Sequence, residues 1–136
     1  MGKLSAFLHP AVINEEKEVI ISKRFLDENG DPVPFKIKAL SQEENEKITK
    51  QSTKPVKTKG GIIEKLDSVE FGRRLVVAGT VEPNFSSEEM CKAYGVLDPL
   101  SVPGKMLLSG EFSRLLREIS DLSGFSSEDI GEEVKN

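Results

Sequence analysis

Residues 18–39 read Glu-Val-Ile-Ile-Ser-Lys-Arg-Phe-Leu-Asp-Glu-Asn-Gly-Asp-Pro-Val-Pro-Phe-Lys-Ile-Lys-Ala, and this stretch decides the fold class. Apolar and polar residues alternate on both sides of the turn-forming segment 27–31. Alternation that flanks an Asn-Gly pair is a strong signal for a β-hairpin, with strands expected near 18–25 and 33–39. The apolar face of this hairpin would carry Val19, Ile21, Phe25, Val33, Phe35, Ile37 and Ala39.

Helices are expected to cover this face, because a two-stranded hairpin alone is only marginally stable in water. Ser41 and Glu44 form a capping-box pattern that predicts a short helix over 42–50. Apolar spacings of three and four, together with capping and proline signals, predict further helices near 62–80, 86–95, 103–108 and 111–123. We therefore predict an α+β domain, in which an N-terminal β-hairpin packs on a cluster of short α-helices and most of the chain is helical.

The chain has 136 residues, which is the size of one ordinary domain. We expect that domain to span 18–125, preceded by a flexible N-terminal arm over 1–17 that Phe7 and Leu8 anchor. Segment 50–61 has four lysines, no acidic residue, one proline and a Gly-Gly pair, so it predicts a mobile Lys-rich loop. Residues 126–136 are acidic and poor in apolar residues, which predicts a C-terminal tail.

Residue types that support catalysis or metal binding are scarce. The only histidine, His9, lies next to Pro10 in the expected flexible arm, so it is a poor candidate for the base that a catalytic nucleophile needs. The only cysteine, Cys91, falls on a predicted helix and is most simply interpreted as a small buried hydrophobe. One cysteine and one histidine cannot form a Cys/His metal site or an internal disulfide. We therefore expect no enzyme activity and no catalytic, cofactor-binding or metal-binding residue.

The charge balance argues against nucleic acid as the main partner. The formal net charge is −4 and the pI is about 5.2, whereas phosphate binding relies on clustered basic residues. The Lys50–Lys59 loop is the local exception, but it has no interleaved aromatic residue or arginine. A small nucleic-acid-binding or regulatory protein that uses this loop is the alternative interpretation. No apolar run is long enough to cross a membrane, and we expect a cytoplasmic protein.

Several pieces of sequence, taken in order, resemble a known family. They are Ser22–Phe25, Asp27–Ala39, Val76–Phe85, Ala93–Val96, Met106–Phe112 and Glu132–Asn136. The ordered set resembles the XkdN-like tail assembly chaperones of long-tailed bacteriophages, of the PBSX prophage type, from about Phe7 to Asn136.

This resemblance implies a function, a partner and a location. Such a protein binds the very long, helical tape-measure protein and keeps it soluble during tail tube assembly, and the tail tube protein is a further candidate partner. It is made in the host bacterial cytoplasm and is absent from the mature virion. The family has no catalytic motif to transfer to this chain.

The clearest helical stripe supplies the hypothesis for a partner-binding surface. Its members are Phe112, Leu115, Leu116, Ile119 and Leu122. The alternative is that these five residues form the core, since a stripe at helical spacing usually faces inward. The sequence leaves both interpretations open, and it leaves the oligomeric state open.

Overall fold

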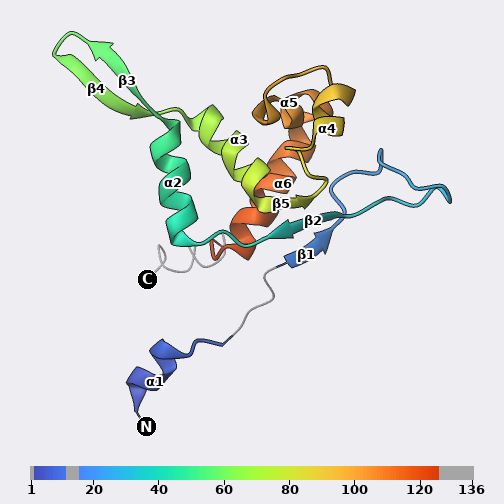
Figure 1. Ribbon diagram of the computed structural model, residues 1–136, viewed down its shortest axis with the longest axis horizontal. Coiled ribbons are helices and arrows are strands. Elements are labelled where there is room, and N and C mark those ends of the chain that lie inside the picture. Colours follow the sequence, from blue (N-terminus) through green and yellow to red (C-terminus); the bar gives the residue numbers. More distant parts are fainter. Residues whose placement is uncertain (1, 12–15, 126–136) are drawn as a thin grey trace.

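The computed structural model describes residues 2–11 and 16–125, and its main sheet has three antiparallel strands in the order β1-β2-β5. The strands are β1 (Glu16–Val19), β2 (Phe35–Lys38) and β5 (Thr80–Glu82). Because β2 is the central strand and one face of it meets the helices, Phe35 and Ile37 are only 2 % and 0 % exposed. β2 is therefore the strand on which the core is built (Figure 1).

Helices supply most of the remaining structure, which confirms the predicted α+β class. The other elements are α1 (Lys3–Leu8), α2 (Gln42–Ser52), β3 (Thr53–Thr58), β4 (Gly61–Leu66), α3 (Ser68–Gly79), α4 (Glu88–Ala93), the 3-10 helix η1 (Pro99–Ser101), α5 (Val102–Met106) and α6 (Ser109–Leu122). Figure 1 shows α3 and α6 crossing beside β2 and β5.

The predicted N-terminal hairpin exists, but its strands are shorter than expected. β1 begins at Glu16, inside the predicted arm, and pairs with β2 through the register Val19 opposite Phe35. Residues 20–34 form a long connection, in which the Asp27 carboxylate accepts the N–H groups of Asn29 and Asp31 at 2.8 and 3.0 Å. The first strand ends early because the chain beyond it turns toward α6 instead of continuing along β2. The third strand, β5, was not predicted, because Thr80 was assigned to the end of the helix expected over 62–80 and the next two residues to no element.

The prediction of a mobile loop over 50–61 is wrong. Residues 53–58 and 61–66 instead form a second β-hairpin, β3 and β4, joined by the two-residue turn 59–60. Thr58 closes the turn, since its hydroxyl donates to the Gly61 carbonyl at 2.8 Å. The prediction failed because every residue from 54 to 66 is exposed, so burial imposes no alternating pattern on the sequence.

The helix predicted over 62–80 therefore begins later than expected. Asp67 caps α3, because its carboxylate accepts the N–H groups of Val69 and Glu70, each at 3.1 Å. The capping box of α2 is confirmed, with Glu44 N–H donating to the Ser41 hydroxyl at 3.1 Å and the reverse bond present. The other helix boundaries agree with the prediction to within a few residues.

The two ends differ from the prediction where the structure describes them. α1 lies inside the predicted flexible arm and buries no residue. Phe7 and Leu8 are 80 % and 63 % exposed, so they do not anchor this segment to the domain. The predicted acidic tail, 126–136, lies outside the described residues.

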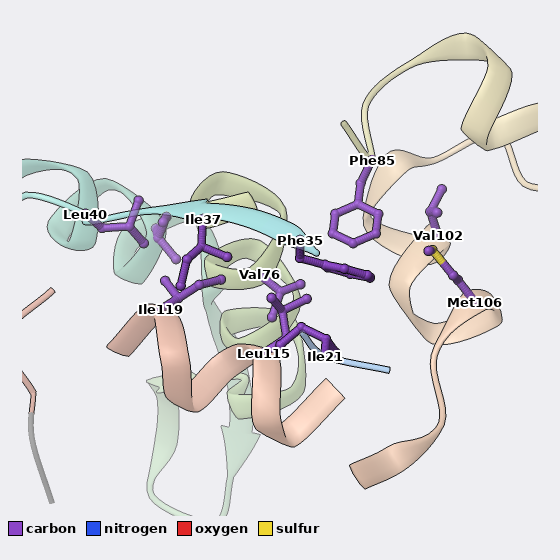
Figure 2. Close-up of a cluster of buried hydrophobic side chains, with 11 residues drawn as sticks. Ile21, Phe35, Ile37, Leu40, Val76, Phe85, Val102, Met106, Leu115 and Ile119 are labelled. Atoms are coloured by element: carbon purple, nitrogen blue, oxygen red, sulfur yellow. The ribbon is translucent and has the colours of Figure 1, made fainter. Parts of the chain in front are cut away.

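A continuous apolar core joins the sheet to α3, α5 and α6 (Figure 2). Its buried members are Ile21, Phe35, Ile37, Leu40, Ile48, Val76, Phe85, Val102, Met106, Leu115 and Ile119. In Figure 2, Leu115 and Ile119 of α6 point toward Val76 of α3 and Ile37 of β2. Two of the predicted partner-binding residues therefore stand at the centre of the fold.

A buried carboxylate attaches the β1–β2 connection to α6. Glu111 is 9 % exposed and accepts hydrogen bonds from the Ser22 hydroxyl, the Arg24 guanidinium and the Leu108 N–H, the last at 2.8 Å. Arg24 also donates to the Met106 carbonyl at 3.0 Å. The hydrogen bonds from Arg24, Ser22 and Leu108 outweigh burial and lower the pKa of Glu111 from 4.5 to about 2.

Glu111 should therefore make the fold sensitive to acid. Its pKa is lower in the folded state, so its stabilisation is complete above the unfolded value of 4.5 and is lost as the pH falls toward 2. Urea denaturation of wild type and Glu111→Gln at pH 6 and pH 3 tests this. The variant should be less stable by about 1–3 kcal/mol at the higher pH, and the difference should shrink at the lower pH. An equal difference at both pH values would contradict the role of the charge.

Candidate partner-binding surface

The five residues predicted to bind a partner fall into two groups in the structure, one buried and one partly exposed. Leu115 and Ile119 are 0 % and 1 % exposed and belong to the core, so the folded protein cannot present them to a partner. Phe112, Leu116 and Leu122 are partly buried at the edge of that core. Only these three can contribute to a surface.

Phe112 and Leu116 line a groove between α3, α5 and α6, which we call the α3–α6 groove. Its volume is about 380 Å³. The apolar residues and glycines that line it are Val69, Gly72, Pro103, Gly104, Leu107, Phe112 and Leu116. Ser68, Ser109, Ser113 and Arg73 complete its wall, so Arg73 supplies the only charge among the lining residues.

Gly72 and Val69 are the apolar α3 residues that border this groove. A Cβ atom placed on Gly72 would lie 3.8 Å from Leu116 Cδ2, which is an ordinary contact, so α3 passes close to α6 at this point. Val69 is 62 % exposed at the first turn of α3. A largely apolar groove of this kind can accept apolar side chains from one face of a partner helix.

A second hollow, of about 480 Å³, lies where α2 begins and α6 ends. Its apolar wall consists of Leu40, Phe71, Leu75, Ile119 and Phe125, and its polar lining consists of Ser41, Gln42, Asn45, Ser120 and Ser123. Phe125 is 56 % exposed, so it covers this hollow only in part. The predicted stripe contributes only Ile119 here, and therefore the α3–α6 groove is the better counterpart of the sequence hypothesis.

The residues that α3 and α5 bring to the groove were not predicted from the sequence. Val69 and Gly72 were assigned to a helix that started too early, and Pro103 and Leu107 were interpreted only as parts of a short helix. The spacing of three between Val69 and Gly72 was the available signal, since it places both on one side of α3. Nothing in the local sequence shows that α5 lies against the same side.

In the part of the chain that the structure describes, the titratable groups with perturbed pKa values lie outside the groove. They are Arg24 and Glu111, which pair with each other, and Glu44, whose pKa is lowered mainly by the backbone N–H of Ser41. Cys91 is partly buried, with Sγ 4.0 Å from the Phe85 carbonyl oxygen. Within residues 2–11 and 16–125, no three His, Cys, Asp or Glu side chains gather as a metal site would require.

The lysines of the predicted loop do not form one basic patch. Lys50 lies on α2, whereas Lys54 and Lys57 are the second and fifth residues of β3 and so point to opposite faces of the hairpin. Lys59 is in the turn. This division offers less to a phosphate backbone than a clustered surface does. Among the helices of the described residues, none has the length and apolar character needed to cross a membrane.

Comparison with known proteins finds one family of relatives, and the similarity covers almost the whole chain. A family profile described as "Phage XkdN-like tail assembly chaperone protein" matches residues 4–135. Protein YqbN of Bacillus subtilis (strain 168) is 39 % identical over 138 residues, covering 98 % of this chain and 93 % of the relative. The phage-like element PBSX protein XkdN of the same strain is 36 % identical with the same coverage.

A solved structure supports the fold. The crystal structure of YqbN superposes with a TM-score of 0.75 at 34 % identity, covering 93 % of this chain and 99 % of that chain. The overall arrangement of sheet and helices is therefore shared with YqbN.

Proposed function

The chain belongs to the family of XkdN-like phage tail assembly chaperones, and from this premise we propose that it binds the tape-measure protein through the α3–α6 groove. Binding would keep the tape-measure protein soluble while the tail tube assembles, and the tail tube protein is a second candidate partner. The proposed role is non-enzymatic. It would be carried out in the host bacterial cytoplasm, and the protein would not remain in the mature virion.

The groove itself is the observation that supports this binding site. Val69 is largely exposed, and Phe112 and Leu116 are only partly buried, although all three are apolar. A long helical partner presents apolar residues at spacings of three and four, and such a stripe can insert into an apolar groove. Covering the groove would remove apolar area from water on both proteins, which is the main driving force of such binding.

Co-expression with the tape-measure protein, followed by co-purification and a solubility assay, tests the proposal. Val69→Asp and Leu116→Asp place a carboxylate in the groove, where burial against an apolar partner is costly. Each variant should weaken binding at least about tenfold, which corresponds to about 1.4 kcal/mol. Far-UV circular dichroism and thermal melting should show that each variant still folds.

Leu97→Asp is the matched control, because Leu97 is fully exposed and lies outside both hollows. It introduces the same carboxylate and should leave partner binding unchanged. If folded groove variants bind as well as wild type, the groove is not the binding site. If wild type fails to bind or solubilise the tape-measure protein and is retained on nucleic acid at low salt, the chaperone role is wrong and the alternative gains support.

A further inference from the structure

The β3–β4 hairpin stands apart from the rest of the domain. In Figure 1 it extends from the ends of α2 and α3, away from the main sheet and from α4–α6. Its six paired positions run from Thr53 opposite Leu66 to Thr58 opposite Gly61, and every residue from 54 to 66 is exposed. A two-stranded hairpin without a covering element is marginally stable in water, so this segment has a surface suited to a further contact.

Apolar side chains occupy both faces of the hairpin. Val56 and Ile63 are direct partners on one face, where they are 38 % and 50 % exposed. Ile62 and Leu66 lie on the other face and are 68 % and 42 % exposed. Three of these four residues belong to β4, so the apolar contact area is concentrated on one strand.

The two edges of the hairpin are not equivalent. β3 contains Pro55, which has no N–H group to donate and is typical of a strand that resists further pairing. β4 reads Gly-Ile-Ile-Glu-Lys-Leu and contains no proline. The edge of β4 therefore offers both hydrogen-bonding groups and apolar side chains to an added strand.

The charge of the hairpin indicates what kind of strand would fit. Residues 53–66 contain four lysines and one glutamate, a formal charge of +3, in a chain whose total is −4. Glu70 of α3 pairs with Lys54 at 3.3 Å, whereas Lys57, Lys59 and Lys65 have no ion-pair partner among the described residues. Two such hairpins would repel each other, so the charge disfavours a second copy and favours an acidic partner.

We propose that the free edge of β4 binds an extended segment of a partner protein as a third strand, and that this segment alternates acidic with apolar residues. Apolar residues of the segment would lie on the face of Ile62 and Leu66, and its carboxylates would lie on the opposite face near Lys65 and beside Lys59 in the turn. This inference rests on the proposed function in one respect, because the partner would be the tape-measure protein. The hairpin would then supply a charge-selective contact in addition to the apolar groove.

Peptide binding to the full chain tests this without the tape-measure protein. The probe is a labelled peptide of about ten residues with alternating Glu and Val, and the control peptide alternates Lys and Val at equal length. Fluorescence anisotropy should show that wild type binds the Glu-Val peptide and not the Lys-Val peptide. Raising the salt from about 50 to about 500 mM should weaken this binding, because exposed charges are screened.

A charge-reversal variant and a matched control locate the site. Lys57→Glu/Lys59→Glu/Lys65→Glu should reduce Glu-Val peptide binding at least about tenfold. Lys47→Glu/Lys92→Glu/Lys105→Glu makes the same change in net charge at exposed positions outside the hairpin and should reduce it by no more than about twofold.

Three results would overturn the inference. The first is that wild type binds the Glu-Val and Lys-Val peptides equally well. The second is that the hairpin variant binds the Glu-Val peptide as tightly as wild type does. The third is that wild type forms a dimer in analytical ultracentrifugation and that the hairpin substitutions dissociate it. The last result would assign the edge of β4 to a second copy. None of these measurements depends on the tape-measure protein, so failure here is distinct from failure of the proposed function.

Discussion

Leu115→Ala should destabilise the protein by about 2–5 kcal/mol, which is the range for removing a buried leucine side chain from a packed core. Leu115 is 0 % exposed and lies in the core cluster with Ile21, Val76 and Ile119. Small domains have a total stability of about 5–15 kcal/mol, so this loss would consume a large part of it. Urea denaturation followed by circular dichroism measures the change.

Leu116→Ala is the matched control, because the same side chain is truncated one position along the same helix. Leu116 is only partly buried and lines the α3–α6 groove, so the expected loss is about 1 kcal/mol or less. Leu116→Ala should instead weaken partner binding. Equal destabilisation by the two variants would contradict the division of the α6 stripe into core and surface residues.

Gly79→Ala should destabilise the protein by about 1–3 kcal/mol, the usual range for an overpacked core. A Cβ atom at Gly79 would lie 2.5 Å from Ile119 Cγ2 and 2.9 Å from Ile119 Cδ1. Ile119 is β-branched and 1 % exposed, so it has little freedom to move aside. The penalty is steric, because Gly79 does not have a positive φ that would itself require glycine.

Gly72→Ala provides the control on the same helix. Its Cβ atom would meet Leu116 at 3.8 Å, which is an ordinary contact, and alanine is favoured over glycine inside a helix by about 0.5–1 kcal/mol. We therefore expect Gly72→Ala to be neutral or stabilising. In an Ile119→Ala background the penalty of Gly79→Ala should disappear, and a penalty that persists there would show that the clash is not its cause.

Elements with a one-sided burial pattern could be predicted from the sequence. α6 was predicted within a few residues because Leu115 and Ile119 must face inward and so impose the helical period. The antiparallel pairing of β1 with β2 followed from alternation around Asn29 and Gly30. The β3–β4 hairpin was mistaken for a loop because no face of it is covered, so no burial pattern marks its strands.

The candidate site could be predicted only in part. The sequence identified the stripe that contains Phe112 and Leu116, but it could not separate them from Leu115 and Ile119. That separation depends on where α3 and α5 pack, because Leu116 faces the groove that Val69 and Gly72 of α3 border. Val69 and Leu107 joined the site through packing between helices that are distant in the chain.

The sequence by itself determined the helical periods, the turn between the first two strands and the ordered motifs that identified the family. Only the tertiary structure decided which side chains are core, which line the groove and where strand β1 ends. The Arg24–Glu111 pair shows the physical reason, because it joins residues 87 positions apart and directs the chain beyond β1 toward α6. Periodicity is a local property of a chain, whereas burial depends on neighbours that only the folded structure brings together.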